Sequence, residues 1–232
     1  MENITLKGTK KVEIPYFLNQ IEHGTDKKVL IVGECVAADQ ISTSLIDKEC
    51  KDVTTTDIRD RPEDGWLNSN TEWKHINSDF IEFDETNKYD YIISISVFEH
   101  FGLFWDNKSM FDNSTGVDDY IRWNHDIKGI VKSCKLLKDK DSKVIITLPA
   151  GPFMNYNESG HPILRYYDTQ RQNLIKETIK GVGCKLTDEK FYYSPDYENW
   201  SESDSEINQP KFYHINNSYS PNVIWAFTIQ KK

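Results

Sequence analysis

Residues 29–40 read VLIVGECVAADQ. Four aliphatic residues follow one another and stop at a single glycine, Gly33. A short, continuous apolar run of this kind is typical of a strand buried on both faces of a parallel sheet. A glycine directly behind such a strand lets the backbone turn sharply and approach a ligand closely. On its own the stretch fits either a nucleotide-binding turn or a buried strand with a plain loop after it. The sequence around it is needed to distinguish these two interpretations.

Four further segments read as strands of the same sheet. YIISISV at 91–97 and KVIITL at 143–148 are nearly continuous apolar runs, whereas KDVTTTDI at 51–58 and EWKHIN at 72–77 are weaker. Because the strong runs do not alternate between apolar and polar residues, they predict strands that are covered on both faces.

Helices are expected before and between these strands. The apolar spacing over 118–137 predicts an amphipathic helix, and another is expected around 15–22. A helix over 168–180 would take Asp168 as its N-cap and Gly181 as its C-cap. Strands that alternate with helices imply right-handed βαβ units and a mostly parallel sheet.

The C-terminal part of the chain has a different pattern. KLTDEKFYY at 185–193 and NVIWAFTIQ at 222–230 alternate more and have no helix between them, which predicts an antiparallel pair. The whole chain, 1–232, is therefore predicted to be one α/β domain with a Rossmann-like, mostly parallel seven-stranded sheet, helices on both faces and an antiparallel last strand. Segments 98–126 and 194–221 are expected to be lids or substrate loops.

Charge and cysteine content narrow the classes of function. The chain has 28 basic and 37 acidic residues, so its net charge of −9 disfavours binding to nucleic acid and to anionic membranes. No signal peptide or membrane span is expected, because no apolar run is long enough. The four cysteines form no C-x-x-C pair, which fits reduced thiols in a cytoplasmic protein better than a zinc site. A homodimer is left open.

Polar side chains stand where the expected strands end, which is where open α/β sheets bind ligands. Asp57 follows Gly33 at close to the spacing, about 20 residues, at which an acid accepts hydrogen bonds from both ribose hydroxyls of an adenosine. Asp79 and Phe80 follow the third strand, where a carboxylate can meet the adenine amino group and a ring can pack on the base. Taken alone, Asp57 and Asp79 are also ordinary turn residues.

The ordered set VLIVGEC, Asp57, SDF, YDYIISISVFEHFGL and KVIITLP resembles the class I S-adenosylmethionine-dependent methyltransferases over residues 25–190. SVFEHFG is the most specific part, being similar to the fourth-strand motif of many small-molecule methyltransferases. RYYD at 165–168 resembles a branch that methylates sugars or glycans. The resemblance implies S-adenosylmethionine as the cofactor and a small-molecule acceptor, with a hydroxyl of a sugar or glycan precursor favoured.

The resemblance also assigns roles to residues at the strand ends. The methionine part would lie at the glycine turn, the ribose and adenine at the second and third strand ends, and the acceptor beyond the fourth. The implied cofactor residues are Gly33, Glu34, Cys35, Asp57, Ile58, Asp79, Phe80, Ser96 and Val97. The implied substrate residues are Glu99, Trp105, Trp123, Arg165 and Tyr167.

His100 is the candidate catalytic residue. Methyl transfer is an in-line displacement in which positioning supplies much of the rate. A hydroxyl acceptor must also lose its proton, and histidine side chains suit general-base work near neutral pH. The alternative, that His100 only caps or packs the following helix, has equal weight.

The glycine turn departs from the family pattern. Ile31 stands where an acid is usual, and Cys35 and Ala37 replace the second and third glycines. A non-catalytic binding or assembly subunit with a methyltransferase fold therefore stays open. A dinucleotide-dependent enzyme is less favoured because G-x-G-x-x-G is absent.

A metal site is not expected. Three acids, Asp112, Asp118 and Asp119, lie close together in the sequence and have the oxygen ligands that a divalent cation prefers. Clustered acids in a loop are more often solvated, so these residues do not predict a metal.

Overall fold

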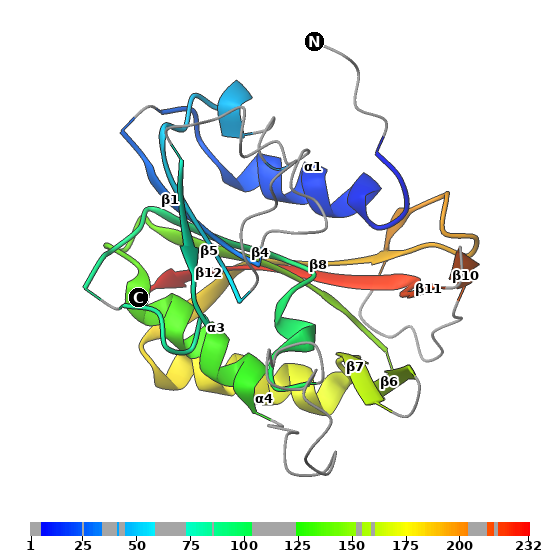
Figure 1. The fold of residues 1–232 in the computed structure, drawn as a ribbon. Coiled ribbons are helices and arrows are strands. Elements are labelled where there is room, and N and C mark those ends of the chain that lie inside the picture. The colour runs from blue at the N-terminus through cyan, green and yellow to red at the C-terminus, as the bar shows by residue number, and fades with distance from the viewer. Residues whose placement is uncertain are drawn as a thin grey trace.

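The computed structural model shows a central sheet between two layers of helices (Figure 1). α1 (Lys10–Gln20) covers one face, and α3 (His125–Leu136) and α4 (Thr169–Gly181) cover the other. The structure describes residues 6–24, 26–33, 41, 45–58, 73–84, 86–103, 124–151, 155–158, 161–203, 213–215 and 218–232.

Eight strands within these described residues form the central sheet. In spatial order they are β3 (Lys74–Asn77), β2 (Asp52–Asp57), β1 (Lys28–Val32), β4 (Tyr91–Ile95), β5 (Lys143–Pro149), β12 (Val223–Lys231), β8 (Cys184–Tyr193) and β9 (Ser201–Ser203). The first five are parallel, and β12 runs antiparallel to both β5 and β8. The strand order reverses between β1 and β4, so the switch point of the sheet lies directly after these two strands.

Side chains of β1 explain why its sequence is apolar throughout. Val29 and Ile31 lie in the apolar cluster that contains Phe17 of α1, whereas Leu30 and Val32 lie in the cluster that α3 and α4 cover. Successive side chains of a strand point to opposite faces, and here a helix layer covers each face.

The predicted fold class is confirmed, with one strand more than expected. β9 pairs antiparallel with β8 at the edge of the sheet, where Tyr193 faces Ser201. Its sequence, Ser-Glu-Ser, has no apolar pattern. A short edge strand of this kind is held by its backbone hydrogen bonds to β8 and needs no buried side chains. The predicted antiparallel pairing of 185–193 with 222–230 is confirmed.

Two helix boundaries differ from the prediction. α1 begins at Lys10, so the predicted start at Pro15 is wrong. Proline is common in the first turn of a helix, but here Pro15 lies inside the helix. Asp168 is the N-cap of α4, and its carboxylate accepts a hydrogen bond of 2.8 Å from the backbone N–H of Arg171. Gly181 is still helical, and the left-handed residue after the helix is Gly183, with φ of 79°.

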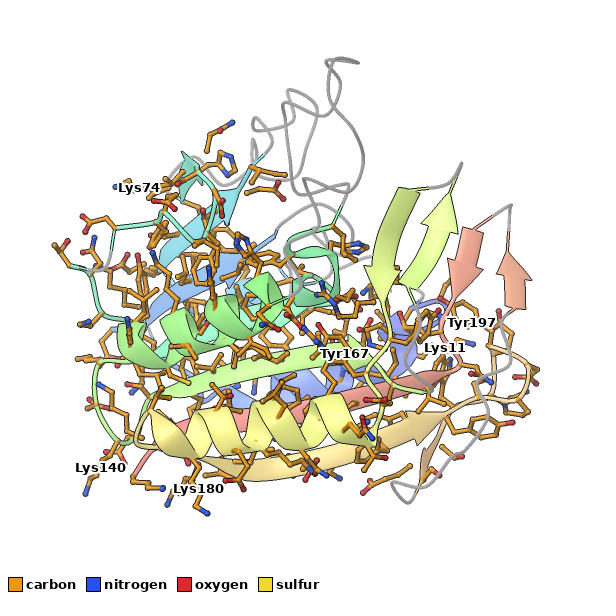
Figure 2. All side chains as sticks on the ribbon, turned by 90° about the horizontal axis from the view of Figure 1, so that it is seen from below. Lys11, Lys74, Lys140, Tyr167, Lys180 and Tyr197 are labelled. Atoms are coloured by element: carbon orange, nitrogen blue, oxygen red, sulfur yellow. The ribbon has the colours of Figure 1, made fainter. Side chains whose placement is uncertain are left out.

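Two small hairpins lie at the same end of the sheet (Figures 1 and 2). One is β6 (Asn155–Glu158) with β7 (His161–Arg165), and the other is β10 (Tyr213–Ile215) with β11 (Ser218–Ser220). The hairpin of β6 and β7 follows the carboxyl end of β5 in the chain. Because the second hairpin lies at the same end of the sheet, both stand near the carboxyl ends of the parallel strands. Of the helices that the structure describes, none has the length and apolar character needed to cross a membrane.

Candidate functional site

The turn after β1 is closed by a contact with the segment after β4. Gly33 has φ of 71°, and its N–H donates a 2.8 Å hydrogen bond to the carbonyl of Thr56 in β2. A Cβ on Gly33 would lie 2.2 Å from Cγ1 of Val97, so only glycine fits at this point of the turn. The structure thus brings Gly33 and Val97, two predicted cofactor residues, together at the switch point. Glu34 and Cys35 lie outside the described residues.

Asp57 and Ile58 stand beside this turn. Val32 of β1 pairs with Thr56 of β2, so Gly33 and Asp57 are the next residues on neighbouring strands. Both Asp57 and Ile58 are partly exposed. The acid therefore lies beside the glycine turn, and its contact with a ribose stays a prediction.

Asp79 and Phe80 follow β3, and local packing accounts for much of their environment. Oδ1 of Asp79 accepts a 2.8 Å hydrogen bond from the N–H of Ile81, which is an ordinary turn arrangement. The ring of Phe80 is buried, with its centroid 6.0 Å from that of Phe98 and 6.2 Å from that of Phe101. Their contacts with an adenine stay predictions.

The residue after β4 has an unusual backbone conformation. Ser96 has φ of 53°, in the left-handed region that residues other than glycine rarely adopt. Its N–H donates to the carbonyl and the hydroxyl of Thr147 in β5, each at 3.2 Å, and its own hydroxyl donates to Oε1 of Glu13. The turn that carries Val97 is thus held from β5 and from α1. Strained backbone of this kind is concentrated at functional sites.

Glu13 is a buried carboxylate that sequence reasoning missed. Its Oε1 accepts hydrogen bonds from the hydroxyls of Ser96 and Thr147 (2.7 Å), and its Oε2 lies 2.6 Å from Nζ of Lys10. Burial alone would raise the pKa of Glu13, but Lys10 and the two hydroxyls lower it, and the net shift is downward. The side chain is therefore an anion at neutral pH. The one signal in the sequence was a single acid between Val12 and Ile14.

Glu99 and His100 lie in the short helical turn η2 (Phe98–His100), which follows Val97. Glu99 is 2% exposed, and its Oε2 has no hydrogen-bond partner among the described residues. Burial raises the pKa of Glu99 to about 8 against the effect of its own backbone N–H, and the charge of Glu13 raises it further. At neutral pH Glu99 is thus mainly a neutral carboxylic acid. His100 is partly exposed, on the same turn.

A second buried cluster is centred on Asp126, at the start of α3. Arg171 binds both carboxylate oxygens, at 3.0 and 2.6 Å, and the hydroxyl of Tyr167 donates to Oδ2 at 2.9 Å. Arg165 lies 3.4 Å from the same oxygen and donates to the carbonyl of Phe101 at 3.2 Å. The structure therefore brings the predicted substrate residues Arg165 and Tyr167 together on an acid that the prediction did not include.

Arg165 keeps hydrogen-bonding capacity within this cluster. Its side chain is fully buried, yet Nε and Nη2 have no partner in the described part of the chain. Burial and the charge of Asp126 raise the pKa of Tyr167 well above its usual value, so its phenol stays neutral. The charges of Glu13, Lys10 and Arg165 all act on Glu99, and that of Glu13 raises its pKa while those of Lys10 and Arg165 lower it. Glu99 is thus linked electrostatically both to the pair of Glu13 and Lys10 and to the Asp126 cluster.

Other predicted site residues are not tested by this geometry. Trp105 and Trp123, and also Asp112, Asp118 and Asp119, lie outside the described residues. Within the part of the chain that the structure describes, no group of three His, Cys, Asp or Glu side chains is arranged to hold a metal ion.

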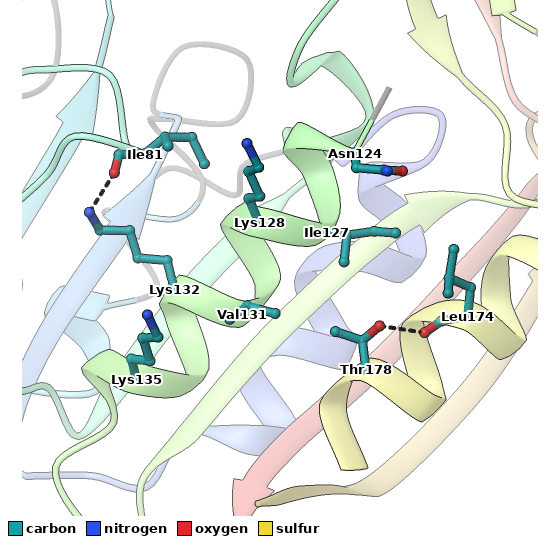
Figure 3. Close-up of a pocket in the computed structure, with 9 residues that line it drawn as sticks. All are labelled: Ile81, Asn124, Ile127, Lys128, Val131, Lys132, Lys135, Leu174 and Thr178. Atoms are coloured by element: carbon teal, nitrogen blue, oxygen red, sulfur yellow. Dashed lines mark hydrogen bonds between the residues drawn. The ribbon is translucent and has the colours of Figure 1, made fainter. Parts of the chain in front are cut away.

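A separate surface pocket of about 400 Å³ lies along α3 and α4 (Figure 3). Lysines of α3 stand on one side of it, and Nζ of Lys132 donates a 2.7 Å hydrogen bond to the carbonyl of Ile81. Its lining residues are Ile81, Asn124, Ile127, Lys128, Val131, Lys132, Lys135, Leu174 and Thr178. None of the predicted site residues lines it.

Comparison with known proteins identifies the fold. No protein-family model and no curated protein matches the sequence. A 1,6-didemethyltoxoflavin-N1-methyltransferase from Burkholderia thailandensis, solved with that substrate and S-adenosylhomocysteine, has a TM-score of 0.51 and 12% identity, over 89% of this chain and 72% of that one. An S-adenosylmethionine-dependent methyltransferase from Clostridium acetobutylicum has a TM-score of 0.52 and 10% identity, over 95% and 91%.

A third solved structure points the same way. The glycopeptide N-methyltransferase MtfA, complexed with S-adenosylhomocysteine, has a TM-score of 0.52 and 8% identity, over 95% of this chain and 89% of that one. Identities this low establish the fold alone. The fold is that of the class I S-adenosylmethionine-dependent methyltransferases, as the resemblance in sequence implied.

Proposed function

We propose that the protein is an enzyme that binds S-adenosylmethionine across the carboxyl ends of β1, β2 and β4 and transfers its methyl group to a small molecule. The observation that carries the proposal is the tight contact of Gly33 with Val97, beside Asp57, at the switch point of the sheet. Open α/β sheets bind their ligands at this point. The side chain of Val97 takes the space that a Cβ on Gly33 would need, so this tight turn between the two strand ends requires glycine.

The residues at the strand ends fit the parts of this cofactor. Asp57 accepts hydrogen bonds from the two ribose hydroxyls, because a carboxylate only accepts and a diol can donate twice. Ile58, Asp79 and Phe80 flank the adenine, and Glu34 and Cys35 bind the methionine part. When bound, the cofactor supplies a methyl group on a positively charged sulfur, which leaves as a neutral thioether.

The acceptor site is assigned to the groups beyond β4. Glu99, as a neutral carboxylic acid, can donate to an acceptor oxygen or accept from its hydroxyl, and Arg165 can donate through Nε and Nη2. Tyr167 positions Arg165 through Asp126. Trp105 and Trp123 would supply apolar surface, and 98–126 and 194–221 would cover the site. His100 takes the proton from a hydroxyl acceptor.

The favoured acceptor is a hydroxyl of a sugar or glycan precursor. Support comes from the RYYD segment and from hydrogen-bonding groups that suit a polyol. A nitrogen acceptor is the alternative, because two of the similar structures are named as N-methyltransferases. Incubation with labelled S-adenosylmethionine and a panel of sugar nucleotides and amines tests the choice, since label in an amine alone would contradict the sugar assignment.

Binding of S-adenosylhomocysteine tests the cofactor assignment. Titration calorimetry should show binding by the wild type and a loss of about 10- to 100-fold for Asp57→Ala, since hydrogen bonds to charged groups contribute about 1.5–3 kcal/mol. Asp52→Ala is the matched control, because Asp52 is an exposed acid at the other end of β2. Equal affinity of the wild type and Asp57→Ala would contradict the ribose contact.

The alternative function is that of a non-catalytic binding or assembly subunit, and the residue at position 31 supports it. Ile31 occupies the place of the usual acid at the end of β1, and a non-catalytic binding or assembly subunit does not need that acid. Such a subunit need not bind the cofactor, so absence of S-adenosylhomocysteine binding by the wild type would favour it. We place the enzyme in the cytoplasm, supported by the free thiols of Cys50, Cys134 and Cys184. Sedimentation would test for a homodimer.

A further inference from the structure

We propose that Lys10 and Glu13 of α1 bind the amino-acid end of S-adenosylmethionine, and that Glu13 replaces the acid missing from β1. The inference rests on the proposed function and adds two residues to its site. The amino-acid end of the cofactor carries an ammonium and a carboxylate. Glu13 would accept from the ammonium, and Lys10 would donate to the carboxylate.

The hydrogen-bonding capacity of the pair supports this assignment. A carboxylate has about four acceptor sites, and Glu13 receives three donors, from Lys10, Ser96 and Thr147. The ammonium of Lys10 has three N–H donors, and its bond to Glu13 uses one of them. Glu13 thus retains one acceptor site and Lys10 retains unused N–H donors. Together they complement the ammonium and the carboxylate at the amino-acid end of the cofactor.

The location of Glu13 supports it as well. Ser96, which donates to Glu13, directly precedes Val97, the residue that packs on Gly33. Ile31, which stands where the family has an acid, lies in the same apolar cluster as residues of α1. An acid from α1 therefore enters on the face of the sheet from which the usual acid is missing.

The structure holds α1 in place in its middle and at its N-terminal end. The hydroxyls of Tyr16 and Thr228 are hydrogen-bonded at 3.0 Å. Before the helix, a Cβ on Gly8 would lie 2.3 Å from the ring of Tyr197, and Lys11 is paired with Glu198. Glu13 is thus presented on a fixed helix, and a ligand group that it binds meets a preorganised partner.

A purely structural role for Glu13 makes a different prediction. In that case Glu13 would only attach α1 to β4 and β5, and its loss would weaken every ligand of the site alike. S-adenosylhomocysteine and 5′-methylthioadenosine separate the two roles. Both contain the adenosine and the thioether, but the second lacks the ammonium and the carboxylate.

Titration calorimetry of both ligands against wild type, Glu13→Gln and Lys10→Met is the test. Each variant should lose about 10- to 100-fold in affinity for S-adenosylhomocysteine, the effect of a hydrogen bond to a charged group, and keep its affinity for 5′-methylthioadenosine. Glu22→Gln is the matched control, because Glu22 is an exposed acid just after α1. Lys10→Met leaves Glu13 in place and keeps the test valid if Glu13→Gln does not fold.

Three outcomes would overturn the inference. Equal losses for both ligands, or no loss for either, would leave Glu13 and Lys10 structural while the cofactor assignment stands. A wild type that binds neither ligand would overturn the proposed function and this inference with it.

Discussion

Cγ1 of Val97 lies 2.2 Å from the point that a Cβ of Gly33 would occupy. The two residues follow neighbouring strands, β1 and β4, at the point where the strand order of the sheet reverses. Gly33 also has a positive φ, which an alanine adopts only with strain. The shape of the turn therefore depends on both residues, one through its missing side chain and the other through its branched one.

Gly33→Ala should destabilise the protein and abolish binding of S-adenosylhomocysteine. The left-handed backbone costs alanine about 1–2 kcal/mol, and overlap with Val97 adds an overpacking cost of about 1–3 kcal/mol. Urea unfolding measures the total. Adding Val97→Ala to this variant should recover the overpacking part only, because the backbone strain remains. A Gly33→Ala protein as stable as the wild type would contradict the contact.

The central strands could be predicted because a strand that is buried on both faces has a continuous run of apolar residues in its sequence. The apolar runs at 29–32, 91–97 and 143–148 closely match β1, β4 and β5. The edge strand β9 has no such run, since its residues are exposed or only partly buried. The start of α1 was misplaced because Pro15, a common first-turn residue, lies inside the helix.

The candidate site was only partly predictable, for a different reason. Residues with a fixed spacing from a strand end, such as Gly33 and Asp57, can be assigned from the family pattern. Glu13 cannot, because its partners Ser96 and Thr147 lie 83 and 134 residues away in the chain. Asp126 meets Arg171 across 45 residues for the same reason. Buried polar networks depend on tertiary packing that local sequence does not encode.

Replacing Glu99 with glutamine should change how stability depends on pH. The pKa of Glu99 is raised to about 8 in the folded protein from an ordinary value of 4.5, because the side chain is buried. Between these values the unfolded chain loses the proton that the folded chain keeps, so this group's contribution falls as pH rises, by at most about 1.4 kcal/mol per pH unit.

Urea unfolding of wild type and Glu99→Gln from pH 5 to pH 8 measures this contribution. The stability of Glu99→Gln relative to wild type should rise across the range, since the variant has no proton to lose there. Glu82→Gln is the matched control, because Glu82 is exposed. A constant difference between Glu99→Gln and wild type would show that Glu99 titrates normally.

His100→Ala should slow methyl transfer to a hydroxyl acceptor. Loss of a general base costs about 10²- to 10⁴-fold in rate, and the limb of the pH–rate profile that reports histidine protonation should disappear. Initial rates across pH, with an acceptor found in the sugar-nucleotide panel, are the measurement. His23→Ala, at an exposed histidine, serves as the control. If the rate and profile of His100→Ala equal those of the wild type, His100 is a packing residue.

Asp126→Ala should be among the most destabilising single changes in the described part of the chain. The carboxylate is fully buried and holds Arg165, Arg171 and Tyr167 together. Removing one partner of a buried ion pair leaves an uncompensated charge and costs about 3–5 kcal/mol. In an Arg165→Met background the same change should cost less, because the fully buried cation is gone. Urea unfolding of the four proteins gives the coupling, and costs that simply add would mean that Arg165 and Asp126 do not interact.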